Sequence, residues 1–342
     1  MNLEDRIASF VKAGERLRNY SLDDFLSSAA KTAEEENPWF TQEQISHALV
    51  AWSGLLGERQ LTEWLEPYRS KLSQPITPKT IGSVMAGNIP MVGFHDMLCV
   101  LISGNRLKAK LSSQDRRLLP AFCSVLSGIS PEWTGYISFE EGLLSGFDAV
   151  IATGSNNTSR YFHYYFGKYP HIIRTSRNSV AVLTGNETDD ELRGLASDIF
   201  LYFGLGCRSV SKLFLPEGYA PERLTAPFSG FAGYYHHHKY RNNYDYHRSI
   251  FMLDRTPCYD GGFYLMKEDP SPSSPVSVIH YAYYRDMDEV EKWIELEQDH
   301  LQCVVSSGGL AGARVLPGMT QSPGLGDYAD GIDTMVFLTE KI

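Results

Sequence analysis

The chain of 342 residues carries a net charge of −10, and 43% of its residues are hydrophobic and 21% charged. These proportions are those of an ordinary globular enzyme, and the length predicts two domains rather than one core. The acidic balance argues against the clustered basic surface that nucleic acid requires, so an anionic ligand would need a local group of cations.

The N-terminus and the cysteines indicate a reduced cytoplasmic protein. Residues 1–20 are charged and amphipathic without an apolar signal core, and no apolar run approaches the length needed to cross a bilayer. The five cysteines are scattered, and none forms a Cys-X-X-Cys pair. This pattern indicates neither a zinc site nor a disulfide framework. We therefore expect no membrane span, no nucleic-acid partner and no bound metal.

The N-terminal part of the chain is predicted to be helical. Apolar residues recur at helical spacing between residues 7 and 17 and again between 45 and 56. Asn37-Pro38 separates two of these helices. The segment 74–79 holds two prolines and is interpreted as a connector.

From residue 80 onwards, short apolar strands alternate with helices. The expected strands are 81–85, 106–110 and 147–152, and the expected helices are 93–102, 115–126 and 161–167. This alternation predicts a parallel sheet with helices on both faces. Ligands of such sheets bind beyond the carboxyl ends of the strands, which is where Asn88 and Gly154 lie.

A cysteine follows the next predicted helix, which runs from about residue 187 to 203. Gly204 and Gly206 break this helix before Cys207, and an apolar strand is expected from about Leu213. A cysteine in such a turn has an accessible sulfur and nearby backbone N–H groups, which suits a nucleophile with an oxyanion site. The alternative is that Cys207 is an ordinary buried thiol.

The later chain contains strands from about residue 172, at 180–183 and at 276–281, and an acidic helix at 288–296. It also contains three consecutive histidines, His236 to His238, in an aromatic run. Consecutive side chains seldom point at one ion, so a metal site is the weaker interpretation. We interpret the run as a helix packing face or as the lining of an acyl tunnel.

Four stretches, in order, resemble motifs of the aldehyde dehydrogenase superfamily. They are Asn88-Ile89-Pro90, Gly104-Asn105 through Lys110, Gly154-Ser155, and Gly206-Cys207 with Ser211 and Phe214. Within that superfamily, three further segments resemble the long-chain fatty acyl-CoA reductases of bacterial luminescence systems. They are Gly206 to Ser209, Asn242-Asn243-Tyr244, and the Pro-Gly-Leu-Gly-Asp-Tyr run from Pro323. The resemblance implies an α/β fold with a Rossmann-type cofactor domain and an α/β catalytic domain that carries the cysteine.

The same resemblance implies three segments. Residues 1–173 would form a helical N-terminus and the nucleotide-binding domain, and residues 174–320 the catalytic cysteine domain. Residues 321–342 would form a C-terminal segment that returns to the cofactor domain. The oligomerisation hairpin of the superfamily is not found before Ile81, so a homo-oligomer is left open.

The resemblance also assigns the chemistry. Cys207 would attack the acyl carbonyl, and the Asn88 amide with the Cys207 backbone N–H would hold the oxyanion. Arg208, next to the sulfur, would lower the pKa of the thiol, although the alternative is an exposed or carboxylate-paired side chain. These roles make Cys207 and Asn88 the expected catalytic residues.

Four residues are implied at the cofactor: Lys110, Ser113, Gly154 and Ser155. Lys110 would meet the adenosine ribose. Many NAD-specific members carry a glutamate where this chain has Ser113, so we expect NADPH, with NADH as the alternative. Arg116 and Arg117 would add positive charge. The competing interpretation is that Ser112 and Ser113 cap the next helix.

One departure from the superfamily pattern bears on the reaction. Counting back from Cys207 without gaps, its hydrolytic glutamate falls on Ile173, which Arg174 follows. A reductase starts from a thioester and uses hydride as the second nucleophile, so it does not need that base. The loss therefore favours reduction of an acyl thioester over oxidation of an aldehyde.

The implied function is NAD(P)H-dependent reduction of an acyl-CoA, of the fatty acyl class, to the aldehyde through a thioester on Cys207. The alternatives are an acyl phosphate reductase of the glutamyl phosphate reductase type and a non-catalytic acyl-binding protein that kept the fold. The expected partners are acyl-CoA or another acyl donor, and an acyl-transfer enzyme is left open as a further one.

Overall fold

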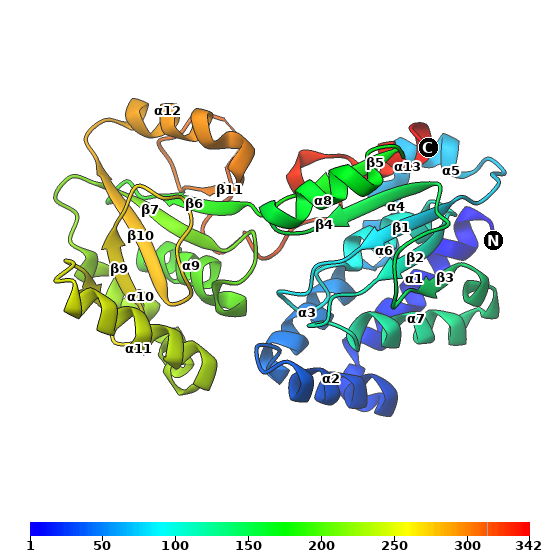
Figure 1. Ribbon diagram of the computed structural model, residues 1–342, viewed down its shortest axis with the longest axis horizontal. Helices are drawn as coiled ribbons and strands as arrows, with labels where there is room; N and C mark the ends of the chain where they lie inside the picture. The colour runs from blue at the N-terminus through cyan, green and yellow to red at the C-terminus, as the bar shows by residue number, and fades with distance from the viewer. Residues whose placement is uncertain (313) are drawn as a thin grey trace. The chain divides into compact units, whose positions relative to one another are not determined.

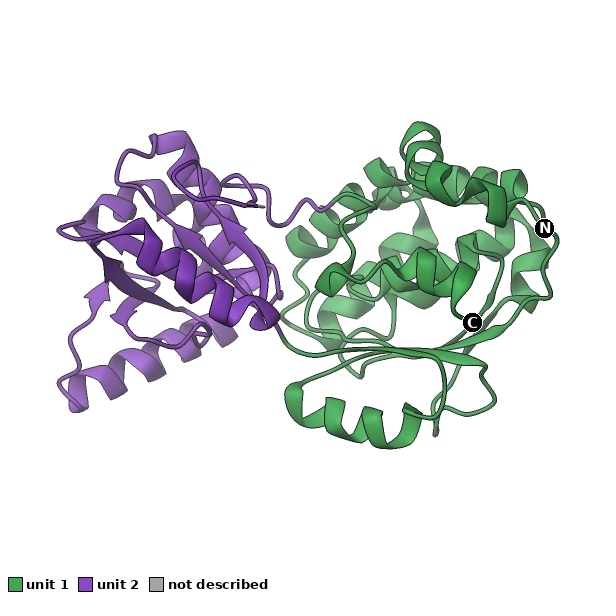
Figure 2. Cartoon of the chain, turned by 90° about the horizontal axis from the view of Figure 1, so that it is seen from above, with its two compact units in different colours: residues 1–176, 324–342 green, residues 177–323 purple. Residues whose placement is uncertain are grey.

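The computed structural model describes residues 1–312 and 314–342. These residues form two compact units (Figure 2). Unit 1 comprises residues 1–176 and 324–342, and unit 2 comprises residues 177–323. The C-terminal residues therefore belong to the same unit as the N-terminus. No helix among the described residues has the length and apolar character needed to cross a bilayer.

Unit 1 begins with a group of helices and continues as a strand–helix alternation (Figure 1). Its helices are α1 Leu3–Arg18, α2 Asp24–Glu36, α3 Gln42–Leu55, α4 Glu58–Leu65, α5 Arg69–Leu72, α6 Phe94–Ile102, α7 Leu118–Ile129, α8 Asn156–Phe166 and α13 Thr334–Glu340. Its strands are β1 Thr80–Val84, β2 Arg106–Lys110, β3 Ile137–Phe139, β4 Ala149–Thr153 and β5 His171–Arg174. The strand at 106–110 has the predicted bounds.

The sheet of unit 1 is open and parallel, in the order β3-β2-β1-β4-β5. Ile81 at its centre pairs with Leu107 on one side and Ala149 on the other. The chain starts at β1, winds outward to β3 and then returns to β4 beside β1. This reversal between β1 and β4 is the topological switch point of a doubly wound sheet.

One hydrophobic core joins this sheet to the N-terminal helices. Fully buried members come from helix α1 (Phe10), helix α6 (Phe94), helix α7 (Phe122) and strand β1 (Ile81). The rings of Phe94 and Phe122 meet edge to face with centroids 4.7 Å apart. The apolar stripes of the sequence therefore face a shared core, as the helical spacing predicts.

Unit 2 contains a second α/β sheet. Its helices are α9 Asp189–Phe200, α10 Thr225–Phe228, α11 His238–Leu253 and α12 Met287–Glu297. Its strands are β6 Asn178–Val182, β7 Val210–Pro216, β8 Tyr259–Asp260, β9 Leu265–Glu268, β10 Val278–Tyr284 and β11 Leu301–Val305. Their order is β11-β6-β7-β10-β9-β8, and all neighbours are parallel except β8 and β9.

Helix α9 begins at a capping box. The Thr188 hydroxyl accepts a hydrogen bond from the Glu191 N–H, and the Glu191 carboxylate accepts one from the Thr188 N–H. These two bonds satisfy donors that a helix start leaves unpaired. The helix therefore has a well-defined start, and it leads towards Cys207.

Candidate functional site

The carboxyl edge of the sheet in unit 1 gathers Asn88, expected to be catalytic, and residues expected at the cofactor. Asn88 lies in the loop after β1, Lys110 is the last residue of β2, and Gly154-Ser155 follow β4. Because these strands are parallel, their carboxyl ends share one edge, and β1 and β4 flank the switch point. Doubly wound sheets bind nucleotides at this switch point, beyond the carboxyl ends of the strands.

Gly154 is required by close packing between β4 and α8. A Cβ at Gly154 would lie 2.8 Å from Cε2 of Phe162 and 3.2 Å from Cβ of Thr158. Ser155 is the N-cap of α8, and its Oγ accepts a hydrogen bond from the Thr158 N–H over 3.3 Å. The helix therefore starts at residue 156, five residues earlier than expected, and its N-terminus lies at the carboxyl edge. A helix N-terminus attracts phosphate.

Lys110 and Ser113 lie on the segment after β2. Lys110 Nζ donates to the Gly142 carbonyl oxygen over 2.7 Å, and Ser113 is exposed. A Cβ on Gly87 would lie 2.6 Å from Cβ of Ser112, so the segments after β1 and β2 touch. Arg117, expected to add charge here, donates from Nε to the Glu36 carboxylate over 2.9 Å. The charge of the Arg117 guanidinium is therefore paired with the Glu36 carboxylate.

The interpretation that Ser112 and Ser113 cap the next helix is wrong. Helix α7 begins at Leu118, and the Ser112 hydroxyl instead accepts from the Gln114 N–H over 3.2 Å. The buried carboxylate of Asp115 accepts hydrogen bonds from Met91 N–H and Leu118 N–H, and burial raises its pKa to about 6. Asp115 thus ties the loop that holds Asn88 to the start of α7, and Ser113 is exposed at the edge of the sheet.

The segment before Cys207 is more strained than its glycines alone predict. After α9, the short 3₁₀ segment Leu201–Gly204 has three consecutive residues with positive φ: 56° at Tyr202, 58° at Phe203 and 72° at Gly204. Only the glycine adopts this conformation freely, and the two aromatic residues each cost about 1–3 kcal/mol. Strain of this kind is typical of functional sites.

Cys207 is exposed and sits in the turn between this segment and β7. Its carbonyl oxygen accepts a hydrogen bond from the buried Ser179 hydroxyl, on β6, over 3.0 Å. Because β6 and β7 are parallel, both residues lie at the amino edge of the sheet of unit 2. The sequence analysis missed Ser179, and no motif in the chain marks it.

Arg208 contacts a second cysteine. Its Nη1 lies 3.4 Å from Sγ of Cys303 and 3.5 Å from the carbonyl oxygen of Thr320. Cys303 is buried on β11. An effect of Arg208 on the Cys207 thiol therefore stays a prediction.

Arg174 has a packing role in unit 1. It ends β5, is buried, and its Nη1 lies 2.7 Å from both carboxylate oxygens of Asp96. Its Nη2 donates to Thr334 Oγ1 over 2.9 Å. Ile173 is the position expected for a hydrolytic glutamate, and Arg174 is the residue after it. Through its ion pair with Asp96 and its hydrogen bond to Thr334, Arg174 ties the sheet to α6 and to the C-terminal segment.

The histidine run packs against the strained segment. The His237 ring lies 4.5 Å from the Phe203 ring, and its Nδ1 accepts from the Tyr240 N–H over 3.3 Å at the start of α11. No group of three metal-ligating side chains is found among residues 1–312 and 314–342. Within the run, His237 caps α11 and packs against Phe203.

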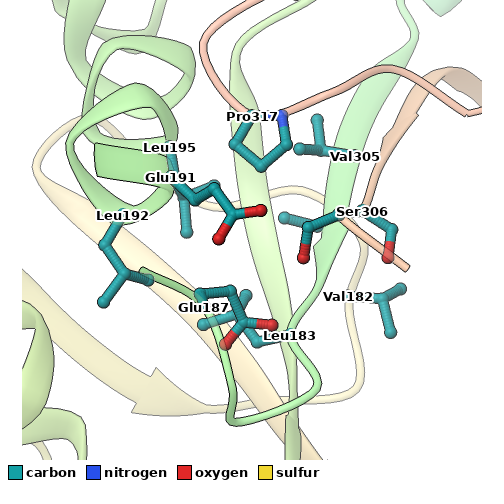
Figure 3. A pocket seen from close by; sticks show the side chains of 11 residues that line it. Val182, Leu183, Glu187, Glu191, Leu192, Leu195, Val305, Ser306 and Pro317 are labelled. Atoms are coloured by element: carbon teal, nitrogen blue, oxygen red, sulfur yellow. The ribbon is translucent and has the colours of Figure 1, made fainter. Parts of the chain in front are cut away.

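A small cavity in unit 2 lies at the other edge of its sheet. Its lining includes Leu183, Glu187, Leu195, Val305 and Pro317 (Figure 3). Leu183 follows β6 and Val305 ends β11, so this is the carboxyl edge, opposite to Cys207. The cavity volume open to a water molecule is only about 10 Å³, which is barely the room that one water needs. It is not a substrate site.

The chain matches a known sequence family over most of its length. The family model of acyl-CoA reductases (LuxC) matches residues 24–224, which is more than half of the chain. Compared by sequence with curated proteins, the chain matches none.

Solved structures of aldehyde dehydrogenases share the fold. Aldehyde dehydrogenase 21 from Physcomitrella patens, in complex with succinate, aligns with a TM-score of 0.63 at 12% identity, over 90% of this chain and 74% of that one. The NAD⁺ complex of the Bacillus cereus enzyme aligns with 0.61 at 13%, over 89% and 72%. Δ-pyrroline-5-carboxylate dehydrogenase from Mycobacterium tuberculosis aligns with 0.59 at 14%, over 89% and 66%. This chain therefore spans about two thirds to three quarters of their length, and its fold is aldehyde-dehydrogenase-like.

Proposed function

Because this chain belongs to the acyl-CoA reductase (LuxC) family, we propose that it reduces an acyl-CoA to an aldehyde through a thioester on Cys207. Cys99, Cys123 and Cys303 are buried, which leaves Cys207 and Cys258 accessible. The position of Cys207 directly after the strained segment carries the proposal. The strained segment before it and the Ser179 hydrogen bond hold its backbone in place. An accessible thiol on a positioned backbone is what covalent catalysis needs.

The first half of the reaction forms the thioester. The Cys207 thiolate attacks the carbonyl carbon, and the C=O electron pair moves onto oxygen. The backbone N–H of Cys207 and the side-chain amide of Asn88 stabilise this oxyanion, and one such donor contributes about 2.7–4 kcal/mol. When the C=O bond re-forms, the bond to the CoA sulfur breaks and CoA leaves as its thiolate.

The second half reduces the thioester. The acyl carbon gains one hydrogen and two electrons, which a nicotinamide cofactor would supply as hydride when bound. The oxyanion donors at Cys207 and Asn88 again hold the negative oxygen. When the carbonyl re-forms, the carbon–sulfur bond breaks, the aldehyde leaves, and Cys207 returns to its thiolate. With Ile173 in place of a glutamate, no carboxylate at that position activates water against the thioester.

We propose that unit 1 holds the cofactor and unit 2 provides the cysteine. Two residues at the carboxyl edge support this assignment: Ser155 caps a helix whose N-terminus attracts phosphate, and Lys110 adds a positive charge. The exposed Ser113 offers a hydroxyl without charge repulsion to a ribose phosphate, so NADPH is the proposed cofactor.

The test separates acylation from reduction. The protein is incubated with acyl-CoA and no cofactor, and we expect one equivalent of free CoA and one acyl mass on the peptide that contains Cys207. Adding NADPH should then release the aldehyde and oxidise the cofactor. Acylation that persists in Cys207→Ser, or that maps to Cys258, would refute the nucleophile. Release of product only from acyl phosphates would favour an acyl phosphate reductase, and acylation without cofactor oxidation a non-catalytic acyl carrier.

A further inference from the structure

The loop that carries Asn88 connects β1 to α6 in unit 1. Both of its ends are bonded to the end of β2 or to the segment that follows it. At the start of the loop, the Met85 N–H donates to the Lys110 carbonyl oxygen over 3.0 Å. Near its end, the Met91 N–H donates to Oδ2 of Asp115 over 2.9 Å. Asn88 therefore lies in the middle of a loop that is fixed on both sides of it.

The Asp115 carboxylate is buried without a cation beside it. The residue is 3% exposed, and its other oxygen, Oδ1, has no hydrogen-bond partner among the described residues. Burial is the main cause of its raised pKa, and the groups that oppose this effect are backbone N–H groups rather than charged side chains. A buried carboxylate in such surroundings lowers the stability of the fold. A costly group of this kind is typical of functional sites.

Met91, the residue that Asp115 binds, has a strained backbone. Its φ is +62°, and the residue is 1% exposed. A residue other than glycine keeps this conformation only where its surroundings hold it. Here the N–H of Met91 is bonded to Asp115, and its carbonyl oxygen accepts from the Phe94 N–H over 2.9 Å. Pro90, whose ring fixes its φ, precedes Met91, so a shift of Met91 is passed back along the loop to Asn88.

We propose that Asp115 is a positioning residue for Asn88, and that its hydrogen bond to Met91 holds the Asn88 amide where the oxyanion forms. The inference rests on the proposed acyl-CoA reductase function and deepens it by adding a residue that acts through the loop. An oxyanion donor works only at its correct distance, and a displacement of about 1 Å can lower a rate about 100-fold. Removal of the Asp115 carboxylate therefore slows acylation although Asn88 is still present.

The experiment measures the acylation half alone, so that an effect on cofactor binding does not enter. Each variant is mixed with excess decanoyl-CoA and no cofactor, and the first equivalent of released CoA is followed after acid quenching. The pH is 8, because burial raises the pKa of Asp115 to about 6 and the carboxylate is then ionised. Asp115→Ala should lower the maximal rate constant about 10–100-fold. The decanoyl-CoA concentration that gives half of this rate should change much less.

Two further variants separate positioning from a general loss of packing. Asp115→Asn keeps the shape of the side chain and an oxygen acceptor but not the charge, so it should recover most of the rate, to within about threefold of the unchanged protein. Asp148→Ala is the matched control. Asp148 also accepts a hydrogen bond from a backbone N–H of β1, that of Thr80 over 2.7 Å, but at the opposite end of the strand. Its loss should leave the rate of acylation unchanged.

The double variant with Asn88→Ala tests the route of the effect. Asn88→Ala alone should slow acylation about 10²–10³-fold. Adding Asp115→Ala should then slow it by no more than about twofold, because no amide remains to be positioned. If Asp115→Ala does not fold, the same comparison with Asp115→Asn decides the question.

The outcomes distinguish this inference from the proposed function. If the effects of Asp115→Ala and Asn88→Ala multiply, or if Asp115→Ala acylates as fast as Asp148→Ala, the inference is overturned and the reductase function stands. Full acylation by Asn88→Ala would overturn the role of Asn88 and this inference together. No Cys207-dependent release of CoA by the unchanged protein would overturn the proposed function, and the inference with it.

Discussion

The hydroxyl of Ser179 donates a hydrogen bond to the backbone carbonyl oxygen of Cys207 over 3.0 Å. Ser179 is fully buried on β6 and is paired in register with Cys303 on the neighbouring strand β11. The turn that carries the exposed Cys207 is therefore hydrogen-bonded to a residue in the interior of the sheet. A flexible loop could not hold a backbone N–H in place for an oxyanion, whereas a turn held in this way can.

We expect Ser179→Ala to lower kcat about two- to tenfold, since one internal hydrogen bond contributes about 0.5–1.5 kcal/mol. The KM for the cofactor should not change, because unit 1 is untouched. Alkylation of Cys207 by iodoacetamide and steady-state rates measure the effect. Ser179→Thr keeps the hydroxyl and should recover most of the rate, and Ser249→Ala, which is exposed on α11, is the control. A rate in Ser179→Ala equal to that of the control would show that the bond does not position Cys207.

Asn88→Ala should lower kcat about 10²–10³-fold, because it removes one oxyanion donor from both halves of the reaction. The apparent affinity for the cofactor should change much less. Single-turnover acylation and full turnover are measured separately, and both should slow. Asn186→Ala, an exposed asparagine in unit 2, serves as the matched control. Full activity in Asn88→Ala would mean that the Asn-Ile-Pro turn is only structural.

Ser113→Glu should weaken NADPH and spare NADH. The new carboxylate would repel the ribose 2′-phosphate, which carries negative charge, whereas a carboxylate can accept hydrogen bonds from the hydroxyls of NADH. The measurement is kcat/KM for both cofactors. Ser124→Glu adds the same charge at an exposed position on α7 and controls for net charge. Equal losses for both cofactors, or a preference for NADH in the unchanged protein, would contradict this interpretation of the pocket.

Lys212 predicts a pH dependence of stability. It is 1% exposed, lies over the rings of Phe214 and Trp293, and burial lowers its pKa from about 10.5 to about 8. Between these two values the unfolded chain binds more protons than the native protein, so this lysine makes the free energy of unfolding rise with pH. Below pH 8 the buried lysine is charged, and it then lowers the free energy of unfolding by its full amount, at most about 3 kcal/mol.

Lys212→Met removes this titration. The free energy of unfolding of Lys212→Met minus that of the unchanged protein should therefore fall as the pH rises from 8 to 10, measured by urea denaturation. Tyrosines that titrate at high pH affect both proteins alike and cancel in the difference. Lys292→Met replaces an exposed lysine on α12 and should show no such slope. A difference that is flat with pH for Lys212→Met would show that Lys212 is charged throughout this range.

The sequence by itself determined the order of the main elements, the alternation of strands and helices, and the family. Apolar spacing and turn residues are local signals, so strand β2 was predicted with its observed bounds and α6 and α12 within one residue of theirs. The recognition of the aldehyde dehydrogenase superfamily and its acyl-CoA reductase branch is confirmed by the family match and the shared fold. The assignments of Asn88, Lys110, Ser113 and Cys207 stay predictions.

Only the tertiary structure decided the features that depend on distant partners. Strands β11 and β3 were missed, since each becomes a strand by pairing with β6 or β2. The positive φ of Tyr202 and Phe203 has no local signal, because packing rather than residue type imposes it. The hydrogen bond from Ser179 to Cys207 joins residues far apart in the chain. Such contacts exist only after the sheet has formed, and no local pattern records them.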